Sequence, residues 1–186
     1  MLLINDRLHE IDLADAMPRL SEERRRKLLQ LRNENERRAS AAGYLLLCRC
    51  LQQKYGICEL PIMEYGQYGK PRIVGHENVH FNISHCRCAV ICAVSDSPIG
   101  VDIETTDRYS PRLAEYTMNS DELQQIQESE NPAVEFTRLW TMKEAFLKMT
   151  GRGITKNIKN VLTGCTAHIL TTLSPDGRYV YSVARP

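Results

Sequence analysis

The sequence lacks several features that would place it in a specialised class of protein. The 186-residue chain has seven cysteines but no C-x-x-C pair, so the usual spacing of a structural zinc site is missing. No stretch approaches the ~20 apolar residues that a membrane-spanning helix needs. Acidic residues interrupt the apolar residues near the N-terminus, which argues against a signal peptide. We therefore expect a cytoplasmic protein, away from the membrane, with reduced thiols.

The sequence also lacks a large excess of charge of either sign. The 24 Lys and Arg residues balance 23 Asp and Glu residues, and the net charge is +1. Nothing global therefore favours nucleic acid as a partner, and any phosphate binding must come from local clusters of charge. The hydrophobic and charged fractions, 42% and 25%, are those of a globular chain. The length predicts one domain or two small halves that share a core.

Local signals predict segments in the order helix, strand, helix, strand, after a short first strand and a loop in residues 1–20. The expected helices begin after Ser21, run over about 34–54, follow Asn119, and run from Asn131-Pro132 to Gly151. The expected strands are 79–84, 89–94 and 99–104, which form a β-meander, and the hairpin 165–173 with 178–184. Strand and helix material occurs twice, so two similar halves that meet near residue 96 are plausible, although the sequence contains no visible repeat.

Gly100-Val101-Asp102-Ile103-Glu104 is the stretch most suggestive of chemistry. On a strand, Asp102 and Glu104 point to one face while the two apolar side chains point to the other. Two carboxylates that are neighbours on one strand face repel each other unless a cation or a basic group lies between them. Carboxylate oxygens suit Mg²⁺, which often completes its shell with water and substrate phosphates. An ordinary edge strand with a polar face would show the same pattern.

A second informative stretch lies in the long helix expected before Gly151. Trp140, Glu144 and Lys148 step by four residues and share one helix face. A surface ion pair would explain the glutamate and lysine, but an exposed tryptophan beside them would be uncommon. A partly buried face with one acid and two lysines, Lys143 and Lys148, is what a phosphate-and-metal site needs.

The third stretch is Phe81-Asn82-Ile83-Ser84-His85. Asn82 and Ser84 share one face of the expected strand. His80 and His85 point to opposite faces, which argues against a metal shared between them. A single histidine at a strand end is more often structural or exposed than functional.

Together these stretches resemble a known family. Residues 100–104 and Trp140-Thr141-Met142-Lys143-Glu144-Ala145-Phe146-Leu147-Lys148 are similar to the two signature motifs of 4′-phosphopantetheinyl transferases. Residues 81–85 and Gly69-Lys70-Pro71 resemble two upstream motifs of the surfactin-synthetase-type branch. The resemblance covers about residues 35–155, and the joint spacing of four motifs makes it specific.

The resemblance implies an α+β fold. Its two similar α+β halves would be related by a pseudo-twofold axis, with the active site at the seam of a monomeric pseudodimer. The N-terminal half, 1–96, would grip the nucleotide of coenzyme A, and the C-terminal half, 97–186, would carry the metal and the catalytic carboxylates. The implied reaction moves the phosphopantetheine arm of coenzyme A to a serine of an apo acyl, peptidyl or aryl carrier protein and releases 3′,5′-ADP.

The resemblance also assigns roles to residues. Asp102, Glu104 and Glu144 would hold Mg²⁺, with Mn²⁺ as an alternative. Glu144 would also be the base toward the carrier serine, and Lys148 would neutralise or protonate the leaving phosphate. The predicted ligands of coenzyme A are Lys143, Lys148, Lys70, Pro71, Ser84 and His85, together with Arg37 and Arg38, which lie near a family arginine.

Two departures from the family pattern and several alternatives remain. The chain is short, and its C-terminal half looks trimmed. Cys86 and Cys88 follow the histidine of the third stretch, so thiols beside the nucleotide site could make activity sensitive to oxidation. A Mg²⁺-dependent phosphohydrolase or nucleotidyl transferase, or a non-catalytic coenzyme A-binding module, would use a similar site. The basic run Arg24–Lys27 is either a solvated helix face or a docking patch for an acidic carrier protein.

Overall fold

The structure is a computed structural model, and it describes residues 1–66, 69–151, 153 and 157–186. The helices are α1 (Leu13–Ala16), α2 (Glu22–Gln30), α3 (Glu34–Tyr55), α4 (Pro111–Thr117), α5 (Ser120–Glu128) and α6 (Pro132–Thr150), with short 3₁₀ turns η1 (Leu8–Glu10), η2 (Met17–Arg19), η3 (Thr106–Arg108) and η4 (Ile158–Asn160). The strands are β1 (Leu2–Asn5), β2 (Met63–Tyr65), β3 (Pro71–Ile73), β4 (His80–His85), β5 (Val90–Ser95), β6 (Gly100–Thr105), β7 (His168–Leu173) and β8 (Tyr179–Arg185). The predicted α+β class is confirmed.

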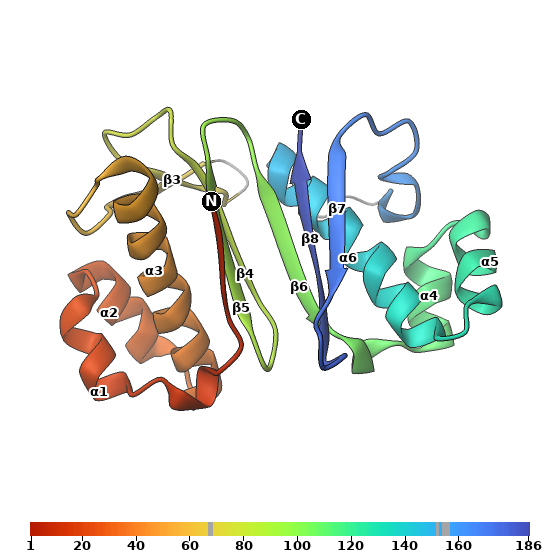
Figure 1. Ribbon diagram of the computed structural model, residues 1–186, viewed down its shortest axis with the longest axis horizontal. Helices are drawn as coiled ribbons and strands as arrows, with labels where there is room; N and C mark the ends of the chain where they lie inside the picture. Colours follow the sequence, from red (N-terminus) through yellow and green to blue (C-terminus); the bar gives the residue numbers. More distant parts are fainter. Residues whose placement is uncertain (67–68, 152, 154–156) are drawn as a thin grey trace.

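Two antiparallel three-stranded sheets organise the chain (Figure 1). The first has the order β1-β5-β4 and the second the order β6-β8-β7. Each of these two sheets thus takes one strand from before a long helix, α3 or α6, and two strands from after it, and the last of the three strands lies between the other two. This equivalence supports the prediction of two similar halves; the pseudo-twofold axis and a boundary at residues 96 and 97 stay predictions.

The predicted β-meander is wrong. β4 and β5 form an antiparallel pair, but β6 does not extend their ladder and instead pairs with β8, from Gly100 opposite Ala184 to Thr105 opposite Tyr179. The short turn after β5 therefore carries the chain from one sheet to the other.

The predicted helix ends are largely confirmed, because they depend on local capping chemistry. The side chain of Asn33 caps the start of α3, and Gly56, with a φ of 69°, ends it. Asn131 caps α6 and Gly151 ends it with a φ of 70°. Only glycine adopts this left-handed conformation without strain. Asn119 and Glu122 form the expected capping box of α5.

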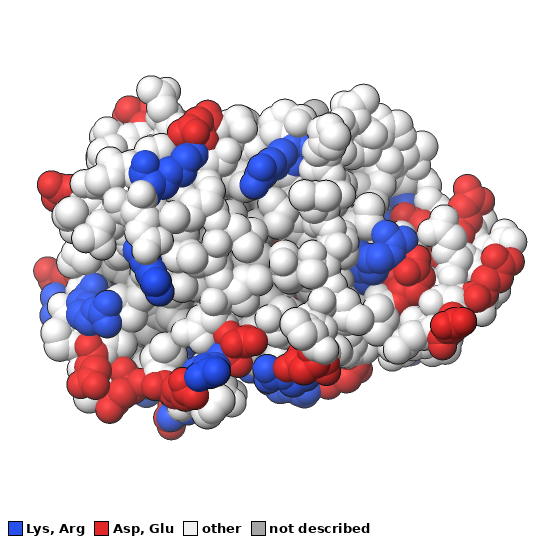
Figure 2. Space-filling view, in the orientation of Figure 1, with Lys and Arg blue, Asp and Glu red and all other residues white. Residues whose placement is uncertain are grey.

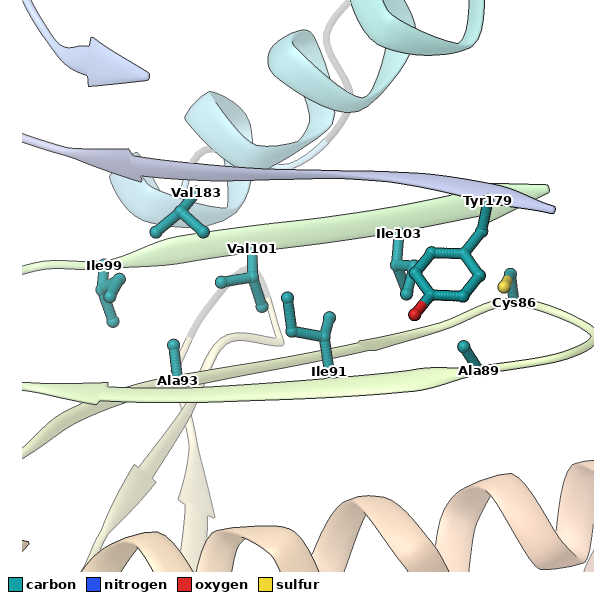
Figure 3. Packing of buried hydrophobic residues seen from close by; sticks show 9 residues of the cluster. All are labelled: Cys86, Ala89, Ile91, Ala93, Ile99, Val101, Ile103, Tyr179 and Val183. Atoms are coloured by element: carbon teal, nitrogen blue, oxygen red, sulfur yellow. The ribbon is translucent and has the colours of Figure 1, made fainter. Parts of the chain in front are cut away.

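The central core lies between the two sheets (Figure 3). Ile91 and Ala93 of β5 face Val101 and Ile103 of β6 across this layer, and all four side chains are fully buried. The long helix α3 covers the other face of the first sheet through a second buried cluster. The predicted alternation along β6 is therefore confirmed, since its apolar residues face the core.

The other face of β6 lies against α6. Gly100 permits this close approach, because a Cβ atom there would collide with the carbonyl oxygen of Ala145 and the amide of Met149. The edge strands β4 and β6 also meet, and the amide of Val101 donates to Asn82 Oδ1 at 2.8 Å. Asp102 is thereby held where two sheets and one helix converge. Within the described ranges, we find no helix with the length and apolar character of a bilayer span.

Candidate active site

The geometry of the site centres on three side chains from three separate elements. Lys148 of α6 donates from Nζ to Asp102 Oδ1 of β6 at 2.5 Å and to Ser84 Oγ of β4 at 2.9 Å. Ser84 in turn donates to the same Asp102 oxygen at 2.8 Å. The Asp102 side chain is 4% exposed. The fold therefore joins residues 84, 102 and 148 into one polar cluster at the seam of the two sheets.

Glu144 lies one helical turn before Lys148 on α6. Its Oε1 atom is buried and, like Asp102 Oδ2, has no hydrogen-bond partner among the described residues. Burial raises the pKa of Glu144, and the neighbouring Asp102 raises it further. Two buried carboxylate oxygens without partners are costly unless a cation or proton accompanies them.

Glu104 carries a different partner. Arg108 Nη1 of η3 lies 2.5 Å from Glu104 Oε1, and the glutamate side chain is 16% exposed. Burial raises the pKa of Glu104, the hydrogen bond from Arg108 lowers it, and Asp102 raises it. In this conformation the arginine neutralises the carboxylate.

The three predicted metal ligands are thus neighbours but are not gathered into one ligand cluster. Over residues 1–66, 69–151, 153 and 157–186, no three His, Cys, Asp or Glu side chains are close enough to hold a metal together. The chemistry of the donors nevertheless fits Mg²⁺ or Mn²⁺, because the two unpartnered oxygens of Asp102 and Glu144 are hard ligands.

A pocket of about 240 Å³ opens beside this cluster. Lys70, which precedes β3, and Pro71, the first residue of β3, line it together with Glu144 and Lys148 of α6. Lys70 Nζ donates to the carbonyl oxygen of Met149 at 2.6 Å, and burial lowers the pKa of Lys70. The structure therefore brings four predicted site residues together, two from each half.

His85 lines a second cavity, of about 490 Å³. Its wall also includes Glu104 and Arg108, together with Ala39 of α3. The His85 side chain is exposed. Since Glu104 and Asp102 are two residues apart on one strand, this second cavity lies near the same polar cluster, and residues of both halves line it.

Comparison with known proteins identifies the family. A family model described as the 4′-phosphopantetheinyl transferase superfamily matches residues 98–179. The chain is 31% identical over 160 residues to the 4′-phosphopantetheinyl transferase psf-1 of Bacillus pumilus. The aligned region covers 84% of this chain and 69% of psf-1. The chain belongs to the 4′-phosphopantetheinyl transferase superfamily.

Further relatives place the chain in the Sfp-like branch. It is 31% identical over 138 residues to the 4′-phosphopantetheinyl transferase Sfp of Bacillus subtilis (strain 168), covering 73% of this chain and 62% of Sfp. It is 34% identical over 121 residues to the 4′-phosphopantetheinyl transferase AcpT of Salmonella typhi, covering 62% of this chain and 60% of AcpT. The chain thus spans about three fifths to two thirds of the length of these relatives, and the family and branch expected from the motifs are confirmed.

Lys143, the other lysine of the transferase motif, does not face the pocket. It is fully buried, and its Nζ donates to Glu122 Oε2 at 2.6 Å and to the carbonyl oxygens of Thr117, Ile158 and Lys159. The expectation that it holds phosphates is therefore not met in this conformation. One residue along a helix turns the side chain by about 100°, which separates Lys143 from Glu144.

Arg37 and Arg38 also differ from their predicted role. Arg37 Nε donates to the carbonyl oxygen of Leu31 at 2.8 Å, and Arg38 pairs with Glu34 at 2.6 Å. Neither lines the two cavities described above, whereas the neighbouring Ala39 lines the second. Their role as ligands of coenzyme A stays a prediction.

Arg108 and Asn82 are the residues that the sequence reasoning missed. The strand pattern predicts the face on which Asn82 lies but gives it no role. In the structure its Oδ1 atom accepts a hydrogen bond from the amide of Val101 at the edge of β6. Arg108 follows Glu104 by four residues, and this spacing indicates an ion pair only when both residues lie on one helix. Here Glu104 lies on strand β6 and Arg108 in the 3₁₀ turn η3, so the spacing gave no signal.

Proposed function

We propose that this protein transfers the phosphopantetheine arm of coenzyme A to a serine of an apo acyl, peptidyl or aryl carrier protein in a Mg²⁺-dependent reaction. The serine hydroxyl attacks the phosphorus that bears the arm, the pyrophosphate bond breaks, and 3′,5′-ADP leaves. The observation that carries the proposal is the contact of Lys148 with Asp102 beside the unpartnered oxygen of Glu144. Cytoplasmic location and a monomeric state belong to the same proposal.

The chain's own groups match the proton transfers of this reaction. A carboxylate with a raised pKa is a better base, so Glu144 accepts the serine proton. Lys148 Nζ, already a donor at the cluster, neutralises the charge that develops on the leaving phosphate. Asp102, Glu104 and Glu144 would hold the metal. When bound, Mg²⁺ neutralises negative charge on the pyrophosphate.

The two cavities near the cluster suit the substrate's nucleotide. Lys70 and Pro71 line one, and His85 lines the other, so we propose that all three contact coenzyme A. Ser84 would act on it indirectly, because its hydroxyl is engaged with Lys148 and Asp102. Relatives named as 4′-phosphopantetheinyl transferases support this substrate.

The contacts of α2 favour the solvated-helix interpretation of the run Arg24–Lys27. Lys27 Nζ lies 2.7 Å from Glu23 Oε1 and donates to the Tyr65 hydroxyl at 2.7 Å. Arg26 pairs with Glu22 at 3.5 Å. The helix lies at the opposite end of the molecule from α5 (Figure 1). Figure 2 displays acidic and basic side chains interspersed over the face in view, with no extended basic patch among its described residues.

Intact-mass spectrometry of an apo carrier protein tests the proposal. Incubation with this protein, Mg²⁺ and coenzyme A should add the mass of one phosphopantetheine group. EDTA and Glu144→Gln should abolish the addition, while Glu128→Gln, an exposed acid of α5, should leave it unchanged.

Other results would overturn the proposal. Coenzyme A binding without modification of acyl, peptidyl or aryl carriers would indicate a non-catalytic binding module. Release of 3′,5′-ADP at the same rate without any carrier would indicate a phosphohydrolase.

A further inference from the structure

Two thiols face each other in the turn between β4 and β5. The Sγ atoms of Cys86 and Cys88 lie 3.7 Å apart, and neither thiol is in a disulfide. The amide of Cys86 donates to the carbonyl oxygen of Ala89 at 2.9 Å, which closes the turn. His85 and Val90 pair across its base. The turn therefore holds both sulfur atoms near contact distance on a fixed base.

The two thiols differ in environment. Cys86 is 8% exposed and belongs to the core cluster with Ala89, Ile103 and Tyr179 (Figure 3). Burial raises the pKa of Cys86 to about 12. Cys88 is only partly buried. An outside reagent therefore meets Cys88 first, while Cys86 is placed to react with whatever forms there.

The turn is also tied to the candidate active site. His85, Cys86 and Arg87 all line the second cavity, which Glu104 shares. Arg87 Nη2 lies 2.5 Å from Asp107 Oδ2, an ion pair that connects the turn to η3. Movement of the residue between the two cysteines would strain this contact and displace the cavity wall.

We propose that Cys86 and Cys88 are an oxidation site that forms a reversible intramolecular disulfide, and that the oxidised protein binds coenzyme A more weakly. The second clause rests on the proposed function; the first does not. A disulfide needs an S–S distance near 2.05 Å, so the sulfur atoms must approach each other. Cys86 is packed in the core, and Cys88 and Arg87 therefore make most of the movement.

The oxidant is a small disulfide such as oxidised glutathione. The Cys88 thiolate attacks one of its sulfur atoms, and a mixed disulfide forms as the first glutathione thiolate leaves. Cys86 then loses its proton, a step that its raised pKa makes slow, and its sulfur attacks the Cys88 sulfur and releases the second glutathione. The two protons of the cysteine thiols end on the two glutathione thiols, so electrons and atoms balance.

Peptide mapping tests the disulfide. Trypsin cleaves after Arg87, so the peptides 73–87 and 88–108 stay joined only if a disulfide links them. After incubation with oxidised glutathione we expect the joined pair and the loss of two hydrogen atoms in the intact mass. Since 88–108 also contains Cys92, the variant Cys92→Ser should keep the link and Cys88→Ser should lose it. Unlinked peptides, with glutathione only on Cys58 or Cys165, would overturn the proposal.

Calorimetry tests the effect on binding. We expect the oxidised protein to bind coenzyme A at least about fivefold more weakly than the reduced protein, with recovery in dithiothreitol. Cys88→Ser treated with the same oxidant should bind like the reduced protein. A mapped disulfide without any change in affinity would overturn the coupling and leave the oxidation site. If the reduced protein does not bind coenzyme A at all, the proposed function fails, and the mapping still decides the disulfide.

Discussion

Lys148 and Asp102 form a hydrogen-bonded ion pair that joins α6 to the edge of β6, with 2.5 Å between Nζ and Oδ1. The aspartate is buried, whereas the lysine is 30% exposed. The pair lies beside Glu144, so one contact both stabilises the fold and sets the charge of the candidate site. Its two contributions can be measured separately.

We expect Lys148→Met to destabilise the protein by about 2 kcal/mol, because among the described residues it leaves the buried carboxylate of Asp102 with only the Ser84 hydroxyl as a partner. Urea unfolding of Lys148→Met, of Asp102→Asn and of the double variant gives the coupling free energy between the two side chains. The double variant should lose less than the sum of the two single losses. Additive losses would contradict a direct interaction. Lys159→Met, an exposed lysine, serves as the control.

Under the proposed function, Glu104 is a metal ligand, and its ion pair with Arg108 would compete with metal binding. Removing the guanidinium in Arg108→Ala frees the carboxylate, so we expect Mn²⁺ to bind about two- to fivefold more tightly, the size of a partly exposed ion pair. Electron paramagnetic resonance of free Mn²⁺ measures this without any turnover. Arg26→Ala is the matched control, since that arginine pairs with Glu22 on α2 instead. An unchanged Mn²⁺ affinity in Arg108→Ala would show that Glu104 is not a ligand.

The raised pKa of Glu144 predicts how stability depends on pH. Between its ordinary value, 4.5, and the raised pKa of Glu144, the folded state holds a proton that the unfolded state has lost. Stability therefore falls as pH rises through this window, and the penalty is fully present above it. The cause is first burial and then the charge of Asp102.

Glu144→Gln removes that penalty. In EDTA at neutral pH we expect the variant to be more stable by about 1 kcal/mol, or about 2–4 °C in Tm, with the gain shrinking as pH falls toward 4.5. Calorimetric melting over a pH series measures it. Glu115→Gln, on an exposed face of α4, is the control. A variant less stable than the wild type at neutral pH would contradict the assignment.

Helix ends and strand faces could be predicted from the sequence because they depend on neighbouring residues. The caps Asn119 and Asn131 and the alternation of Asp102 and Ile103 are such features. The pairing of β6 with β8 could not, because the partners are separated by more than seventy residues and no local signal distinguishes this pairing from a meander.

Site residues divide in a similar way. Ser84, Asp102 and Lys148 were named from motifs, and the structure joins them. Arg37 and Arg38 of α3 instead contact Leu31 and Glu34 and line neither cavity, so their role as ligands of coenzyme A stays a prediction. A motif fixes which residues are present, but the packing of its helix decides which of them reach the pocket.

From inside the fold, Lys143 connects α6 to the C-terminal end of α4, to the start of α5 and to η4. We predict that these contacts stabilise the fold and that Lys143 does not bind coenzyme A. Glu122 is its charged partner, at 2.6 Å, and is itself buried. Breaking a buried pair by removing one member costs about 3–5 kcal/mol, whereas replacing both by apolar residues costs much less. Lys143→Met and Glu122→Leu should therefore each be strongly destabilising, and the double variant should lose clearly less than the sum. The recovery is incomplete, because three carbonyl oxygens still lack the lysine's hydrogen bonds.

Urea unfolding measures the free energies of the two single variants and of the double variant. The coenzyme A affinity of the double variant then separates a role of Lys143 in stability from a role in phosphate binding. Binding within about twofold of the wild type is expected for a lysine inside the fold, whereas a tenfold loss in a folded double variant would restore Lys143 as a phosphate ligand.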